Sequence, residues 1–150
     1  MTVQNQHYRV VLDTNQVVGA GTRWLDYGVP APDTNTHRRV LIRVAESHTG
    51  LYCGKVVGEY LEKLVDLGPP HDRALRLMTY IMGAFSLVTV TTTAAPVPPS
   101  DPDDEIFLLC AIDGAADYLV SEDHALLELK SSYSRPAIGK SVELAEPLGA

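Results

Sequence analysis

The segment "RVVLDTN", from Arg9 to Asn15, places three apolar residues directly before an acid. We expect residues 8–12 to form a buried strand and a helix to start at Thr14. Asp13 then has two interpretations, and the segment alone favours the first, which is an ordinary cap of the following helix. The second is a metal ligand at the carboxyl end of a parallel strand, where open α/β sheets place their sites. Acids in matching positions elsewhere would decide between them.

Composition predicts one ordinary globular domain over residues 1–150. Hydrophobic residues make up 45% of the chain and charged residues 21%, which is typical of such domains. Residues 1–7 are interpreted as a leader that need not be ordered, and 131–150 as a C-terminal edge element. No apolar run approaches the ~20 residues of a membrane span, and the start has no signal-peptide pattern. We therefore expect a cytoplasmic protein without membrane partners.

The charge balance limits how the chain can bind nucleic acid. The formal net charge is −7, whereas proteins that hold nucleic acid non-specifically usually present a basic face. Acids that cluster around a divalent cation would invert the local charge. Cys53 and Cys110 both lie in apolar surroundings and are predicted to be reduced, buried thiols.

Strands alternate with helices along the chain, which predicts an α/β fold with a parallel sheet covered on both faces. Strands are expected at 8–12, 50–53, 87–91 and 117–121. Helices are expected from residue 14 and at 36–48, 54–68, 71–85, 104–116 and 122–130. The tail suggests an edge strand near 136–142 and a helical turn at 143–148.

Acids recur at the boundaries of these elements. Asp13 ends the first strand, Asp104 opens a helix, and Asp123 follows a later strand with one residue between. If the strands are parallel, all three meet at one edge of the sheet. Glu59 lies inside a helix beside apolar residues, where an inward carboxylate costs energy unless it is paired or bound to metal. Each of the three acids at element boundaries could also be a simple turn or cap residue.

Carboxylates that converge without bases raise one another's pKa values, and a hard divalent cation removes this repulsion. Mg²⁺ and Mn²⁺ take oxygen ligands, and such ions can acidify a water for attack on phosphorus. Asn15 is expected to orient a ligand carboxylate or a water from the second shell.

Three motifs in order, "VVLDTNQVV", "VVGEYLEKL" and "DDEIFLLCAIDGAADYLVSEDHALL", resemble the PIN domain family. The branch they resemble most is that of the VapC-like toxin components of toxin–antitoxin systems. The resemblance runs from about residue 8 to 127. It implies a three-layer α/β/α fold with a central parallel sheet and an acidic pocket that binds Mg²⁺ or Mn²⁺.

Carried over by position, the resemblance assigns four catalytic, metal-binding acids: Asp13, Glu59, Asp104 and Asp123. Asp103 or Glu105 could replace Asp104 after a shift of one residue. Asn15 and Ser121 match supporting polar positions of the family. Departures include Glu122, where the family commonly has a small residue, Cys53, where the branch often has Ser, and an unusual insert over 28–39.

The function that this resemblance implies is a metal-dependent endoribonuclease, the toxin of a toxin–antitoxin pair, leaving 5′-phosphate and 3′-hydroxyl ends. Its partners would be RNA, a cognate antitoxin and a second copy in a homodimer. Arg23, Arg38 and Arg39 are candidates for phosphate contacts, although solvated arginines on a helix face explain each equally well. The alternative function is an inactive PIN-like scaffold or RNA-binding module.

Overall fold

The computed structural model describes residues 6–21, 35–67 and 71–150. Its sheet has five strands, all parallel, in the order β3-β2-β1-β4-β5. This confirms the predicted α/β fold with a central parallel sheet. The strands are β1 (Arg9–Leu12), β2 (Thr49–Tyr52), β3 (Ser86–Leu87), β4 (Tyr118–Val120) and β5 (Ala137–Gly139). The helices are α1 (Thr14–Gly21), α2 (Thr36–Ser47), α3 (Gly54–Leu67), α4 (His71–Ala84), the 3₁₀ turn η1 (Pro102–Asp104), α5 (Glu105–Asp113), α6 (His124–Leu127) and α7 (Ser141–Leu148).

Strand β1 lies at the centre of the sheet. This position explains why its sequence contains a continuous apolar run. Val10, Val11 and Leu12 are all fully buried, as expected for a strand covered on both faces. The strand pairs with β2 on one side and β4 on the other. Asp13 continues the ladder by one residue, since its amide donates to the Val120 carbonyl at 2.9 Å.

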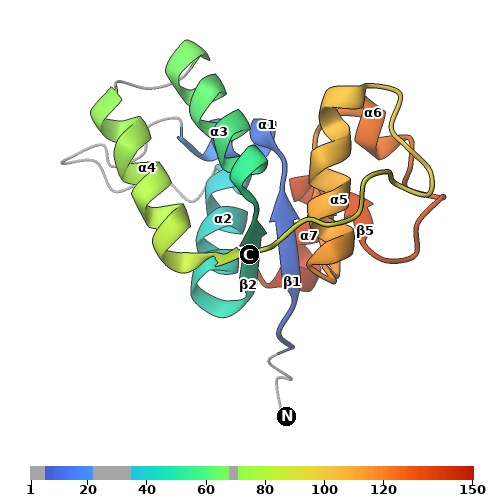
Figure 1. Cartoon of the computed structure of the whole chain (residues 1–150). Helices are drawn as coiled ribbons and strands as arrows, with labels where there is room; N and C mark the ends of the chain where they lie inside the picture. The colour runs from blue at the N-terminus through green and yellow to red at the C-terminus, as the bar shows by residue number, and fades with distance from the viewer. Residues whose placement is uncertain (1–5, 22–34, 68–70) are drawn as a thin grey trace, which may run out of the picture.

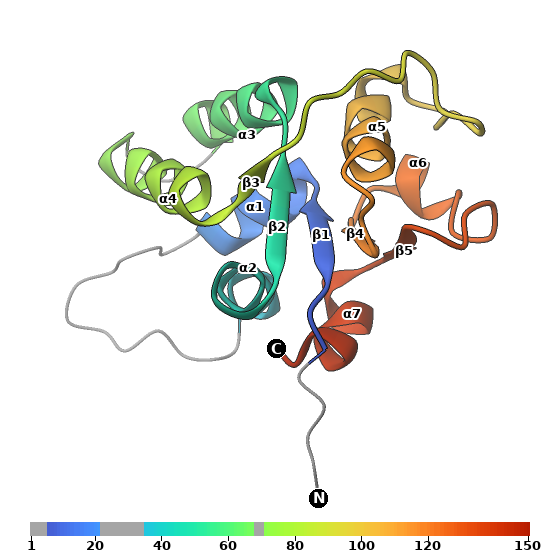
Figure 2. The same cartoon turned by 60° about the horizontal axis from the view of Figure 1, so that its bottom comes forward.

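Helices cover both faces of this sheet. Helices α2 and α7 pack together on one side of the strands, and α5 lies on the other (Figure 2). Helices α3 and α4 lie side by side near the β3 end of the sheet (Figure 1). The chain builds β1, β2 and β3 in one direction and then returns to place β4 against β1. The order of strands therefore reverses between β1 and β4, which is where open α/β sheets form their binding crevice.

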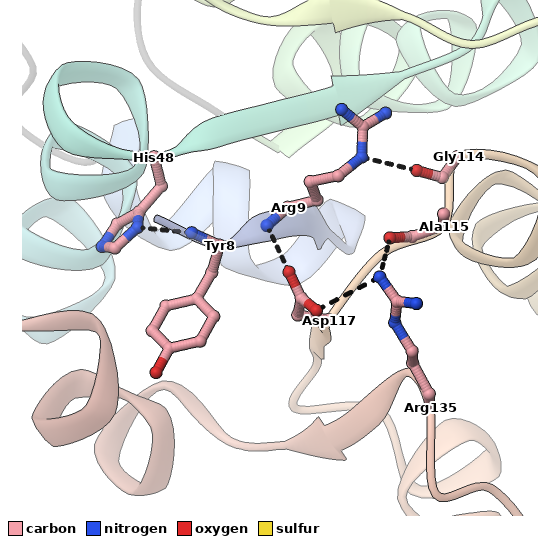
Figure 3. Close-up of polar contacts among 7 residues, drawn as sticks. All are labelled: Tyr8, Arg9, His48, Gly114, Ala115, Asp117 and Arg135. Atoms are coloured by element: carbon pink, nitrogen blue, oxygen red, sulfur yellow. Dashed lines mark hydrogen bonds and ion pairs between the residues drawn. The ribbon is translucent and has the colours of Figure 1, made fainter. Parts of the chain in front are cut away.

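At the amino ends of the strands, where β1 starts, a polar network connects neighbouring segments (Figure 3). The Arg9 amide donates to Asp117 Oδ2 at 2.8 Å, and Arg9 Nε donates to the Gly114 carbonyl at 2.8 Å. Arg135 Nη2 donates to the Ala115 carbonyl at 2.9 Å and lies 3.3 Å from Asp117 Oδ1. These contacts join β1, β4 and the segment before β5, so this network is structural.

The predicted strand over 87–91 is wrong in its extent, because β3 covers only Ser86–Leu87. One further amide, that of Val88, still donates to the Tyr52 carbonyl at 2.7 Å. The Asp113 carboxylate then accepts from the Thr91 and Thr92 amides at 2.7 and 2.9 Å. A hydrogen bond from the Thr92 hydroxyl to Asp113 Oδ1, together with these two amide hydrogen bonds, holds the pKa of Asp113 below its usual value. A side chain thus takes the place of the strand ladder.

Two other predictions from the sequence, on the tail and on the cysteines, are confirmed. The tail forms the edge strand β5 and the helix α7, and both cysteines are buried free thiols. Across the described ranges, no helix has the length and apolar character needed to cross a membrane.

Candidate active site

A pocket of about 280 Å³ opens at the carboxyl ends of β1 and β4. The structure brings all four predicted acids to this pocket, together with two more from the segment around η1. The acids that line it are Asp13, Glu59, Asp101, Asp103, Asp104 and Asp123. Asn15 and Lys63 also line the pocket. Six carboxylates with one lysine among the described lining residues make this a strongly acidic site.

Asp13 is the most buried of these acids, with 3% of its surface exposed. Its Oδ1 accepts from the Gln16 amide at 3.0 Å, and its Oδ2 accepts from the Ser121 hydroxyl. Burial raises the pKa of Asp13 to about 6, although these two hydrogen bonds lower it in part. The bond to Gln16 is a helix cap, so the capping interpretation and a role in the pocket are both compatible with this residue.

Ser121 connects Asp13 to Asp123. Its hydroxyl oxygen accepts from the Asp123 amide at 2.9 Å while its hydrogen is donated to Asp13. Asp123 itself caps α6, because its Oδ1 accepts from the Ala125 amide at 2.9 Å. Ser121 is fully buried, so one side chain links the Asp13 carboxylate at the end of β1 to the backbone of Asp123 after β4.

Asp104 stands at the N-cap position of α5 but makes no capping hydrogen bond with its side chain. Within the described part of the chain, its Oδ2 is buried and has no hydrogen-bond partner. Burial raises the pKa of Asp104 to about 7, and the neighbouring carboxyl of Asp123 adds to the rise. A buried acceptor without a donor is costly, so this environment is unfavourable for Asp104 Oδ2.

The three candidates for the third acid do not all line the pocket. Asp103 and Asp104 both line the pocket. Glu105 is absent from its lining and instead accepts from the Ala95 amide at 3.3 Å. Asp101 reaches the pocket too, and its Oδ1 accepts from the Asp103 amide at 3.0 Å.

Helix α3 supplies Glu59 and Lys63, which are one turn apart. Residues four apart lie on the same helix face, and here that face borders the pocket. Sequence reasoning singled out Glu59 but assigned no role in the site to Lys63 or Asp101. The i,i+4 spacing from Glu59 places Lys63 on the same helix face, but this spacing is too common to single the residue out.

The two described arginines among those proposed to contact phosphate do not line the acidic pocket. Arg38 and Arg39 belong to α2 and are not among the residues that line the pocket. Arg38 is mostly buried, with 9% exposed. Arg23 lies outside the described residues, as does the part of the insert over 28–34. Residues 35–39 of the insert begin α2, whose N-cap is Asn35.

Glu122 departs from the family pattern, and the structure shows where its carboxylate goes. Its Oε1 accepts from the Ser141 amide at 3.0 Å and from the Ser141 hydroxyl at 2.9 Å. Glu122 therefore supports the start of α7 and is not among the residues lining the acidic pocket.

The donor set suits a hard divalent cation. Within the described ranges, no three His, Cys, Asp or Glu side chains are grouped closely enough to form a complete metal site. The lining nevertheless offers carboxylate oxygens, which Mg²⁺ and Mn²⁺ prefer. Asp104 Oδ2 has no partner among the described residues, and burial raises the pKa values of Asp13 and Asp104; a bound cation would stabilise the charged form of both acids.

Comparison with known proteins gives one match. A family model described as a PIN domain matches residues 9–125, a span that contains all four predicted acids. No curated protein and no solved structure shows a significant match to the chain.

Proposed function

This chain belongs to the PIN domain family, whose members are generally nucleases, and from that premise we propose that it is a Mg²⁺- or Mn²⁺-dependent endoribonuclease. The observation that carries the proposal is the acidic pocket at the ends of β1 and β4, in which Asp104 Oδ2 is buried without a partner among the described residues. The metal dependence and the choice of RNA go beyond family membership.

In this proposal, Asp13, Glu59, Asp104 and Asp123 hold the cation. When bound, the cation would lower the pKa of a water and offset the negative charge that develops on the phosphate. Ser121 and the Gln16 amide keep Asp13 in one orientation. Asn15 lies exposed at the pocket, where its amide can orient a water or a carboxylate. Positioning of this kind accounts for much of the catalysis in phosphoryl transfer.

We further propose a biological role as the toxin of a toxin–antitoxin pair. The support is the resemblance of the three motifs to the VapC-like branch. A cognate antitoxin and a homodimer belong to the same proposal. Controlled expression would test toxicity: growth should stop with the wild-type chain and continue with Asp13→Asn.

The activity itself is tested by incubating the chain with a panel of RNAs in Mn²⁺ and in chelator. Cleavage should require Mn²⁺ and disappear in Asp13→Asn. Asp66→Asn is a matched control, because Asp66 is an exposed acid of α3 that does not line the pocket. Binding of RNA without cleavage would instead favour the scaffold function, and cleavage in chelator would exclude the metal-dependent mechanism.

A further inference from the structure

We propose that Lys63 is a substrate-contacting residue whose ammonium group binds a phosphate of the RNA held at the acidic pocket. The inference rests on the proposed nuclease function. It deepens that function because it states which side of the pocket contacts the RNA backbone. Lys63 lies inside the motif "VVGEYLEKL", but the family resemblance assigns it no role.

The first support is position. Lys63 lies on α3 one turn after Glu59, and both residues line the same pocket. The side chain of Lys63 is exposed, whereas Glu59 is half-buried. Lys63 therefore borders the pocket from its solvent side, where a polymeric substrate would approach.

The second support is the absence of a competing partner. Glu59 precedes Lys63 by four residues, the arrangement in which glutamate and lysine commonly pair on a helix. Within the described part of the chain, Lys63 nevertheless forms no ion pair and no hydrogen bond. Its ammonium donors are available to a ligand.

The third support is charge. Six carboxylates line the pocket, and Lys63 is the one cationic side chain among its described lining residues. A divalent ion bound by the acids would attract a phosphate, but the remaining carboxylates would repel the neighbouring backbone. A lysine at the rim offsets that repulsion as a point charge and donates to phosphate oxygens.

A plain alternative is that Lys63 only balances the negative charge of the acids. The two roles predict different effects of Lys63→Ala. As a counter-charge only, its loss would make Mn²⁺ bind more tightly and leave the salt slope of RNA binding unchanged. As a phosphate contact, its loss would weaken RNA binding without weakening Mn²⁺ binding.

The experiment compares the wild-type chain with Lys63→Ala, Lys63→Arg and Lys55→Ala. Lys55 is an exposed lysine near the start of α3 that does not line the pocket, so its variant is the matched control. Binding of a labelled single-stranded RNA is measured by anisotropy over a range of salt concentrations in Ca²⁺, which takes similar oxygen ligands. Cleavage of the same RNA is measured in Mn²⁺, and Mn²⁺ binding is measured by calorimetry.

We expect Lys63→Ala to weaken RNA binding about tenfold and to make the slope of log affinity against log salt shallower by about 0.7, the value for one phosphate contact on a single strand. Lys63→Arg should restore most of the binding, and Lys55→Ala should behave like the wild type. Equal RNA affinity and an equal salt slope for Lys63→Ala, in a wild-type chain that cuts RNA, would overturn this inference alone. A wild-type chain that neither binds nor cuts RNA would overturn the proposed function, and this inference with it.

Discussion

The hydroxyl of Ser121 donates a hydrogen bond to Asp13 Oδ2, linking residues that directly follow the neighbouring strands β4 and β1. The same oxygen accepts from the Asp123 amide. Two acids that are distant in sequence are therefore held relative to each other by one buried hydroxyl. This arrangement makes the geometry of the pocket depend on a residue that bears no charge.

Ser121→Ala should reduce both stability and activity. The substitution leaves Asp13 Oδ2 and the Asp123 amide without their partner, and such a loss costs about 1–3 kcal/mol. It also removes a hydrogen bond that lowers the pKa of Asp13, so the acid limb of the pH profile of kcat/KM should move to higher pH. Urea unfolding and a pH series in Mn²⁺ measure the two effects.

The control for this prediction is Ser121→Thr, which keeps the hydroxyl. It should preserve the position of the acid limb even if the added methyl group reduces stability in a fully buried position. A folded Ser121→Ala chain with an unshifted acid limb would contradict the role assigned to the hydroxyl.

The metal-free chain should lose stability as the pH rises from about 4 to about 7. Asp13 has a pKa of about 6 in the folded chain, above its ordinary value of 3.8, and the pKa of Asp104 is raised to about 7. Between the unfolded and folded pKa values the native state binds more protons than the unfolded state. The free energy of unfolding therefore falls with increasing pH and levels off above the folded pKa values.

Unfolding in chelator at about pH 5.5 and about pH 7.5 tests this sign. Asp13→Asn removes the buried charge and should be more stable than the wild type at the higher pH, by up to about 3 kcal/mol. Mn²⁺ should raise the unfolding midpoint of the wild type much more than that of the variant. If Asp13→Asn is less stable than the wild type in chelator at the higher pH, the burial argument is wrong.

The main elements could be predicted from the sequence because their apolar periodicity is strong. The apolar residues of β1 are continuous, and Tyr60 and Leu64 recur on one face of α3, where both are fully buried. The extent of β3 could not be predicted, because it depends on Asp113, a side chain from α5 that binds the Thr91 and Thr92 amides. Local sequence patterns do not predict a contact between residues this far apart in the chain.

The acids at the pocket could be proposed because parallel strands place their carboxyl ends at one edge. Lys63 could not be singled out in the same way, since a lysine four residues after a glutamate is ordinary on an exposed helix face. The unpaired state of Lys63 within the described structure is a fact of three-dimensional arrangement. The use of Glu122 as support for α7 is likewise set by the distance in space to Ser141.

Tyr60→Phe should weaken the hydrogen bonding of the backbone next to Asp13. The Tyr60 hydroxyl is fully buried and donates to the Leu12 carbonyl, directly before Asp13. Removing the hydroxyl leaves that carbonyl without this donor, at a cost of about 1–2 kcal/mol. The ring is retained, so its packing beside Phe107 should persist.

We expect Tyr60→Phe to lower kcat more than it changes KM, because the residue acts on the position of Asp13 and touches no substrate. Urea unfolding and steady-state cleavage in Mn²⁺ measure this. Tyr52→Phe is the matched control, since the Tyr52 side chain is partly buried and donates no hydrogen bond within the described residues. Equal losses of activity in both variants would remove the specific role of Tyr60.

Glu122→Ala should reduce stability while leaving metal binding intact. The carboxylate accepts from both the amide and the hydroxyl of Ser141, and loss of such a contact at a helix start costs about 1 kcal/mol. Its charge also contributes slightly to the raised pKa of Asp13, so the variant should ease ionisation of that acid. Calorimetry should find Mn²⁺ affinity equal to or higher than that of the wild type. A large fall in Mn²⁺ affinity in a folded Glu122→Ala chain would instead make Glu122 a ligand, and the position that the family usually fills with a small residue would be part of the metal site.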